Sequence, residues 1–254
     1  MKVWDRSRSI AIVAAAVAAM VGAFAAAASA QTDPRVRTAT PSKGLLWGSK
    51  MTVESGPCCA AQKGAKAGDP AEAAVLAKLG DRAARDGPIL WLRLQNGRLL
   101  KITDCDDENA CEADRFRRHR LAAWWPSLGL YVVDVGLYEE GLAYLIAEKD
   151  GQTTRVASLP VLSPSGKRAV ALQSNLMNGV DLDVIDFTTH PPKVTKVQDL
   201  PACPGSGKAS FLRPRPVWVD ETHVRFEGKS PLEEDDPKAR QLLRLVDGQP
   251  QWQC

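Results

Sequence analysis

Five oxygen-bearing side chains stand close together between residues 104 and 109, and they are the first candidates for chemistry. The members are Asp104, Asp106, Asp107, Glu108 and Asn109. Carboxylates suit hard cations such as Ca²⁺ and can serve metal-assisted hydrolysis. The run lacks the glycine and the distal glutamate of a calcium-binding loop, so a solvated acidic turn is the favoured interpretation and no metal is predicted.

The histidines offer the next possibility, because imidazole is the commonest general base. His119, His190 and His223 are the three in the chain, and no Gly-x-Ser-x-Gly run accompanies them. Each is therefore expected to face solvent. The Gly-Ser-Gly-Lys run at 205–208 lacks the first glycine of a phosphate-binding loop and the hydroxyl residue after the lysine, so it indicates a surface loop. No catalytic residue and no cofactor is predicted.

Aromatic side chains beside carboxylates suggest a binding surface instead. Trp124 and Trp125 are adjacent, and neighbours on a strand point to opposite faces, so one of them is expected to be exposed. Tyr138 precedes Glu139 and Glu140 at an expected hairpin tip, a combination that suits contacts with sugars or proteins. These five residues are predicted to bind a partner.

A basic cluster precedes the tryptophans. On a strand, Arg115, Arg117 and His119 share one face, and Arg118 and Arg120 share the other. The cluster could meet an acidic partner or the acidic loop just before it, and ordinary surface pairing is the alternative. Arg117 is included among the predicted binding residues.

Residues 1–30 have the parts of a cleavable signal peptide. A basic start is followed by an alanine-rich apolar run, which ends in Ala28-Ser29-Ala30 before Gln31. An uncleaved membrane anchor is the alternative, because the run approaches the length that spans a bilayer. Cleavage predicts a periplasmic or secreted protein without membrane insertion.

Charge argues against a nucleic-acid partner. The chain has 33 Lys and Arg residues against 30 Asp and Glu residues; residues 1–30 hold three of the former and one of the latter, which leaves +1 for the remainder. A near-neutral exported chain has no overall attraction for polyanions. The expected partner is an envelope protein or a small ligand.

All six cysteines follow the leader, and an even number in an exported chain indicates disulfides. Cys105 and Cys111 enclose a short loop and are predicted to pair, and Cys203 and Cys254 could join the last strands. Cys58 and the adjacent Cys59 could form a strained vicinal bond, or each could pair with Cys203 or Cys254.

The order of elements predicts one domain. Residues 31–43 form a flexible start, and 44–254 form a single β domain with a helical insertion near 63–86, where Asp69 caps a helix that starts at Pro70. From Pro88 onward short apolar runs alternate with turn residues, beginning with the hairpin signal Asn96-Gly97. The fold class is all-β, an antiparallel meander.

Several segments resemble one another and a known repeat. The run LSPSGKRAVA at 162–171 is similar to the Ser-Pro-Asp-Gly-Lys opening of a blade in TolB-like and WD-repeat β-propellers, with Ser165 in place of the aspartate. The matching next strand lies at 180–186, and looser copies lie at 216–226 and 125–132.

The resemblance covers roughly residues 120–250 and extends to exported bacterial proteins of this build. It implies four-stranded blades in a propeller-like and incomplete arrangement, with a β-sandwich as the alternative. It also implies a binding surface, so a binding protein without catalytic activity is expected. The alternative is an envelope hydrolase that uses acidic residues, with or without a metal.

Overall fold

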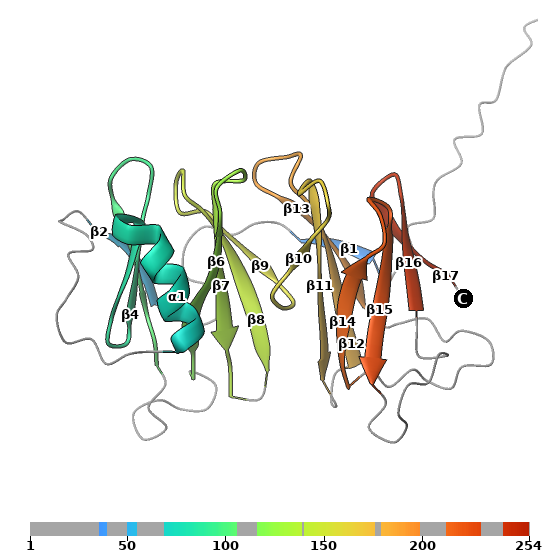
Figure 1. Ribbon diagram of the computed structural model, residues 1–254, viewed down its shortest axis with the longest axis horizontal. Helices are drawn as coiled ribbons and strands as arrows, with labels where there is room; N and C mark the ends of the chain where they lie inside the picture. Colours follow the sequence, from blue (N-terminus) through green and yellow to red (C-terminus); the bar gives the residue numbers. More distant parts are fainter. Residues whose placement is uncertain are drawn as a thin grey trace, which may run out of the picture. The chain divides into compact units, whose positions relative to one another are not determined.

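The computed structural model describes residues 36–39, 50–54, 69–105, 116–138, 140–175, 179–198, 212–229 and 241–253. These residues form four antiparallel β-sheets and one short α-helix, which confirms the all-β class and the meander of hairpins (Figure 1). No helix among them is long and apolar enough to span a membrane.

The first two sheets come from residues 50–156. In spatial order, the first sheet contains β2 (Lys50–Glu54), β5 (Leu99–Thr103), β4 (Ile89–Arg93) and β3 (Ala83–Asp86). The second sheet contains β6 (Arg118–Trp125), β7 (Leu130–Gly136), β8 (Gly141–Ala147) and β9 (Thr153–Val156).

The other two sheets follow the same pattern, with one strand contributed from far away in the sequence. The third sheet contains β1 (Val36–Ala39), β13 (Lys193–Gln198), β12 (Gly179–Asp186), β11 (Arg168–Asn175) and β10 (Val161–Leu162). The fourth contains β14 (Leu212–Trp218), β15 (His223–Lys229), β16 (Gln241–Val246) and β17 (Gln249–Gln253).

Helix α1 (Pro70–Leu79) begins as predicted. The Asp69 side chain accepts a hydrogen bond of 2.8 Å from the backbone N–H of Ala71, and Pro70 occupies the first helical position. The expectation of a helix near 63–86 was wrong at its C-terminal end. Gly80, at φ 57°, ends the helix, and Ala83 lies in β3 opposite Leu92 after the 3₁₀ turn η1 (Gly80–Arg82).

The predicted Asn96-Gly97 hairpin is confirmed between β4 and β5. Gly97 has φ 77°, and its N–H donates to the carbonyl of Leu94 at 2.9 Å. The backbone conformation at Gly97 is one that glycine adopts without steric cost, which is why this dipeptide closes the turn.

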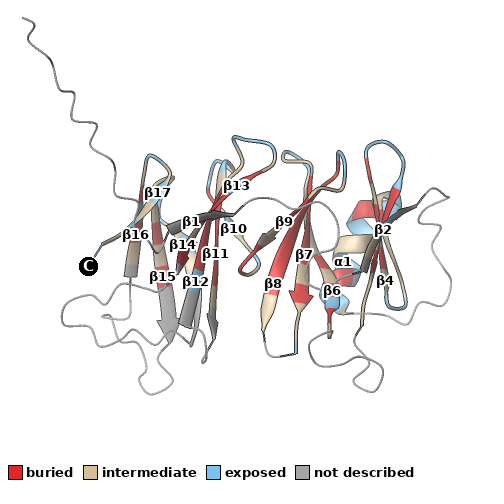
Figure 2. Cartoon of the chain, turned by 180° about the vertical axis from the view of Figure 1, so that it is seen from behind, coloured by how far each residue is buried: buried red, intermediate tan, exposed pale blue. Residues whose placement is uncertain are grey.

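Within the described part of the chain, three buried clusters join neighbouring sheets. One joins the first and second sheets with α1, another joins the second and third, and the last joins the third and fourth. The second and third sheets are therefore covered on both faces, and in the second sheet β7 and β8 are buried along nearly all of their length (Figure 2). In β7, Tyr131 and Val133 face the first sheet while Val132 faces the third.

This arrangement differs from the β-sandwich that the sequence also allowed. A sandwich encloses one core between two sheets, whereas here three cores separate four sheets. Among the described residues, no buried cluster joins the first sheet to the fourth. The stacked antiparallel meanders, three of four strands and one of five, are of the propeller-like kind.

Candidate functional site

A buried ion network attaches α1 to the first two sheets. Glu72 of α1 is only 4% exposed, and its carboxylate accepts hydrogen bonds from Arg85 Nη2 at 2.7 Å and from the Leu121 N–H at 2.8 Å. Arg85 also donates from Nη1 to Asp104 at 3.0 Å and from Nη2 to the carbonyl of His119. We call Glu72, Arg85, Asp104 and His119 the helix network.

The helix network places His119 in the interior, so the expectation that this imidazole faces solvent was wrong. His119 is 1% exposed, its Nδ1 lies 2.7 Å from Asp104 Oδ1, and its ring stacks on Tyr144 with 6.2 Å between centroids. The same carboxylate oxygen accepts the His119 backbone N–H at 2.8 Å. Both contacts hold the imidazole in place rather than present it to a substrate.

The prediction that the acidic run forms a solvated turn was wrong for Asp104, which is buried. Its side chain is 6% exposed and both of its oxygens are used within the helix network. The other four members, Asp106, Asp107, Glu108 and Asn109, lie outside the described residues. No group of metal-ligating side chains occurs in the described part of the chain.

The side chains of the basic cluster point alternately to the two faces of β6 and the residue before it, as predicted. Arg115 lies outside the described residues. Arg117 is 8% exposed and shares the buried face with His119, whereas Arg118 is exposed. Arg120, on the same side as Arg118, donates to Asp69 at 2.9 Å and to Asp134 at 2.7 Å. Arg117 is thus placed inside the protein, away from a partner surface.

The adjacent tryptophans do point to opposite sides, but both are half-buried, so the expectation of one exposed ring was wrong. Trp124 packs into the cluster between the first and second sheets, with the Arg82 guanidinium 4.7 Å from its ring centroid. Trp125 packs into the next cluster, against Phe187 at 5.8 Å. Both faces of the second sheet are covered, which a strand pattern alone does not reveal.

Tyr138 is the predicted binding residue that the structure places at the surface. It is 62% exposed, the largest value among the exposed large apolar side chains of the described chain, and it sits between β7 and β8. Phe116 meets its ring edge-on with 6.4 Å between centroids. Glu140 is half-buried in the same turn, and Glu139 lies outside the described residues.

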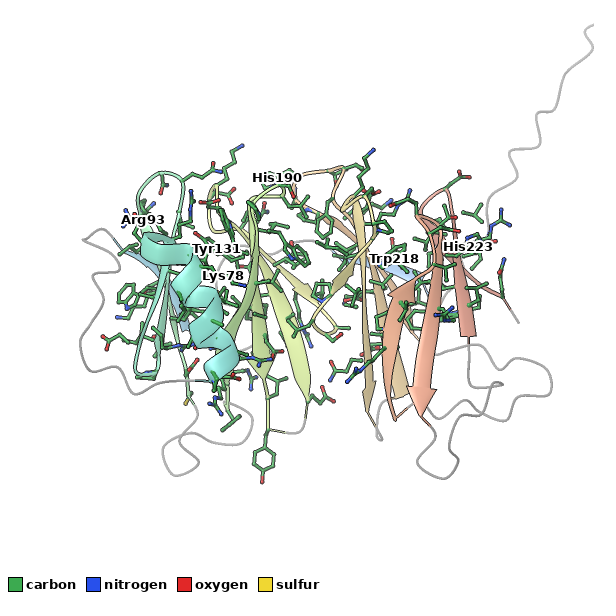
Figure 3. The ribbon with its side chains drawn as sticks, viewed as in Figure 1. Lys78, Arg93, Tyr131, His190, Trp218 and His223 are labelled. Carbon is green, nitrogen blue, oxygen red and sulfur yellow. The ribbon has the colours of Figure 1, made fainter. Side chains whose placement is uncertain are left out.

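Of the other two histidines, His190 lies in a loop and His223 is the first residue of β15 (Figure 3). His190 is exposed, as expected. His223 is half-buried at the start of β15, where its Nδ1 is 2.9 Å from Asp220 Oδ2. Asp220 accepts hydrogen bonds from the N–H and hydroxyl of Thr222, and these lower its pKa to about 2; the contacts with His223 contribute less.

The Gly-Ser-Gly-Lys run at 205–208 lies outside the described residues.

Of the six cysteines, the described residues include Cys105 alone. It is disulfide-bonded and does not titrate as a thiol. The cysteines with which it could pair lie outside the described residues, so the Cys105–Cys111 pair stays a prediction. The same holds for Cys203 with Cys254, and for Cys58 and Cys59.

Polar contacts also link the third sheet and its turns to segments that border the two neighbouring sheets. Asp183 of β12 is 1% exposed and accepts from the Ala157 N–H at 2.7 Å and from Lys196 Nζ at 3.0 Å. Burial raises the pKa of Asp183 despite the opposing pull of Lys196. Across the next junction, Ser165 donates through its hydroxyl to Glu221 at 2.7 Å, and this contact lowers the pKa of Glu221.

Two surface features were missed in the sequence. Four aliphatic side chains on or beside β10 and β14 are exposed: Leu159, Val161, Val217 and Val219. Arg215 and Arg244 are also exposed, on β14 and β16. A two-residue alternation was visible in Arg-Pro-Val-Trp-Val, but which side of the strand would be covered depended on the neighbouring sheet.

No protein-family model matches this chain, and no curated protein and no solved structure is significantly similar to it.

Proposed function

We propose that the chain is an exported binding protein of the cell envelope that contacts a protein partner through the hairpin between β7 and β8. The observation that carries the proposal is Tyr138, whose side chain is 62% exposed at that turn. The basic start, apolar run and Ala28-Ser29-Ala30 exit support export to the periplasm or the medium.

Tyrosine is a favourable contact residue because it adds a large apolar surface with little conformational freedom to lose. The edge-on contact with Phe116 restrains the ring, and the buried strands β7 and β8 provide a rigid base. A hairpin tip projects from its sheet, whereas small-molecule sites are concave, so a protein partner fits this position better than a small ligand.

The proposal is tested by placing a photoreactive amino acid at position 138 in the full-length chain in intact cells. A matched probe at Leu159, which is 36% exposed and lies beside another strand, controls for surface reactivity. A discrete adduct from position 138 alone is expected. Equal labelling from both positions, or no adduct from position 138, would contradict the proposal.

Substitution then measures what the side chain contributes once the adduct has been identified. Tyr138→Ala is expected to weaken binding of the crosslinked partner by on the order of tenfold or more, as for a central aromatic contact. Tyr138→Phe should retain most of the affinity if the ring makes the contact. Because the side chain is largely exposed, neither variant should lower the melting temperature appreciably.

A further inference from the structure

The side of the second sheet that faces the third becomes exposed close to the Tyr138 hairpin. In the register of the strands, Arg118 of β6 pairs with Gly136 of β7, and Gly136 pairs with Gly141 of β8. Ala143, two residues further along β8 and on the same side, is fully buried against the third sheet. Arg118 is exposed and both glycines are half-buried. We call Arg118, Gly136 and Gly141 the glycine row.

An aromatic pair borders the glycine row at the end of the sheet. Phe116 precedes Arg118 by two residues, Tyr138 follows Gly136 by two residues, and the two rings meet edge-on with 6.4 Å between centroids. Residues two apart in extended chain are about 7 Å apart and point to the same side. One partner segment can therefore touch the Tyr138 ring and the glycine row together.

The backbone of the described residues does not require glycine at either position. Neither glycine has a positive φ, and the pairing of β7 with β8 is regular at this point. A methyl group on Gly136 would lie 3.9 Å from the Cβ of Arg118, and one on Gly141 would lie 3.6 Å from the Val135 carbonyl, which are ordinary contacts. Glycine weakens a strand, and where no turn or bulge needs it, it often marks the close approach of another backbone.

Arg118 supplies a positive charge at one end of the glycine row. It forms no ion pair with a described residue, and its cross-strand neighbour has no side chain. Asp134, two residues before that neighbour, is paired with Arg120. Glu140 interacts electrostatically with Arg155 of β9, the strand at the opposite edge of the sheet. An exposed guanidinium beside an aromatic ring matches a carboxylate next to an apolar side chain.

We propose that the Tyr138 surface extends over the glycine row and binds an extended protein segment in which a carboxylate stands beside an apolar side chain. The backbone of the segment lies over the two glycines, its carboxylate pairs with Arg118, and its apolar side chain packs on Tyr138. A bare phosphate group would use the arginine but neither the ring nor the glycines. The inference rests on the proposed function, for which it names the chemistry of the partner.

The test selects peptides from a phage-displayed library of random heptapeptides, on the full chain after removal of its leader. Clones that bind Tyr138→Ala as well as the parent are discarded, so that only peptides on the Tyr138 surface are compared. Selection on the parent should enrich Asp or Glu next to an apolar or aromatic residue. Selection on Arg118→Glu should enrich Lys or Arg at that place, because the charge of the site is reversed.

One acidic peptide from the parent selection then serves as the labelled probe for fluorescence anisotropy. Arg118→Glu should bind it on the order of tenfold more weakly, and added salt should weaken binding to the parent because exposed charges are screened. Arg98 is exposed on the turn between β4 and β5, so Arg98→Glu is the matched control and should bind like the parent.

Gly136→Ala separates binding from folding. The added methyl group occupies the space of the bound backbone, so the probe should bind roughly tenfold more weakly. The melting temperature should equal or exceed that of the parent, because alanine is less costly than glycine within a strand.

Three results would overturn the inference and leave the Tyr138 contact standing. They are selected peptides without an acidic preference, an equal loss of binding in Arg98→Glu, and unchanged binding in Gly136→Ala. Tighter binding of phosphatidylglycerol vesicles than of the probe would also overturn it. If no clone depends on Tyr138, the proposed function itself is contradicted, so the two failures are distinguishable.

Discussion

The junction between the first and second sheets and the junction between the third and fourth are built differently. The first combines an apolar cluster with the helix network, whose buried charges are satisfied by hydrogen bonds. The second relies on apolar and aromatic packing, with Phe226 and Trp252 at 5.3 Å (Figure 3 shows Trp218 at the same junction). Its polar contacts lie at the surface, such as Trp218 Nε1 to the Val161 carbonyl at 2.9 Å.

The difference shows how the two junctions are specified. Buried charges lose hydration, so the helix network adds little net stability as a whole, but removing one member leaves the others uncompensated. It therefore fixes where α1 sits on the second sheet. The packing between the third and fourth sheets is non-directional and depends on filled volume. We expect the first junction to be sensitive to charge and the second to be sensitive to shape.

The largest effect is expected from Glu72→Ala. The substitution removes one of the two carboxylates bonded to Arg85 and leaves the Leu121 N–H without its acceptor in the interior, which should lower the free energy of unfolding by about 3–5 kcal/mol. Chemical denaturation measures it. Asp81→Ala, at a side chain that is 78% exposed, is the control and should change stability by no more than about 0.5 kcal/mol. Equal effects would show that the network does not hold the helix.

The next effect concerns neighbouring leucines of β16 that point to opposite sides. Leu243 is fully buried between the third and fourth sheets, so Leu243→Ala should cost about 2–5 kcal/mol. Leu242→Ala, on the outward face, should cost clearly less. Thermal unfolding of both variants measures the difference. A larger loss for Leu242 would mean that the two faces have been assigned the wrong way round.

A smaller, pH-dependent effect tests the polar contact between the second and third sheets. Burial raises the pKa of Asp183 above 3.8, so the folded state binds its proton more tightly than the unfolded state. The stability that this proton contributes is complete below the unfolded pKa and is lost as the pH rises through the folded value. The stability of the parent should therefore fall relative to Asp183→Asn as the pH rises above 3.8. If the difference in melting temperature between the parent and Asp183→Asn did not change with pH, the argument that burial raises the pKa of Asp183 would be contradicted.

The smallest effect is expected at the surface contact between the third and fourth sheets. The pKa of Glu221 is lowered, chiefly by the Ser165 hydroxyl, so its contribution is present above the unfolded pKa of 4.5 and is lost as the pH falls through the folded value. Glu221→Gln should lower the melting temperature slightly near neutral pH, and the difference should vanish in acid. Scanning calorimetry across this range is the measurement.

The sequence by itself determined the local features of this protein. The alternation of apolar runs with turn residues such as Asn96-Gly97 predicted the meander, and Asp69 with Pro70 predicted the start of α1. These features depend on backbone preferences and capping hydrogen bonds within a few residues, so a short window contains the information. The same reasoning predicted an exposed Tyr138, because a turn between strands lies at the surface.

Only the tertiary structure decided which faces were covered. Trp124, Trp125 and Arg117 were predicted at a partner surface, yet sheets packed on both sides of β6 enclose all three to different degrees. His119 and Asp104 were expected in solvent, yet Arg85 and Glu72, distant in sequence, bring them into one buried network. Alternation tells which side chains share a face, but whether that face meets water or another sheet depends on residues far along the chain.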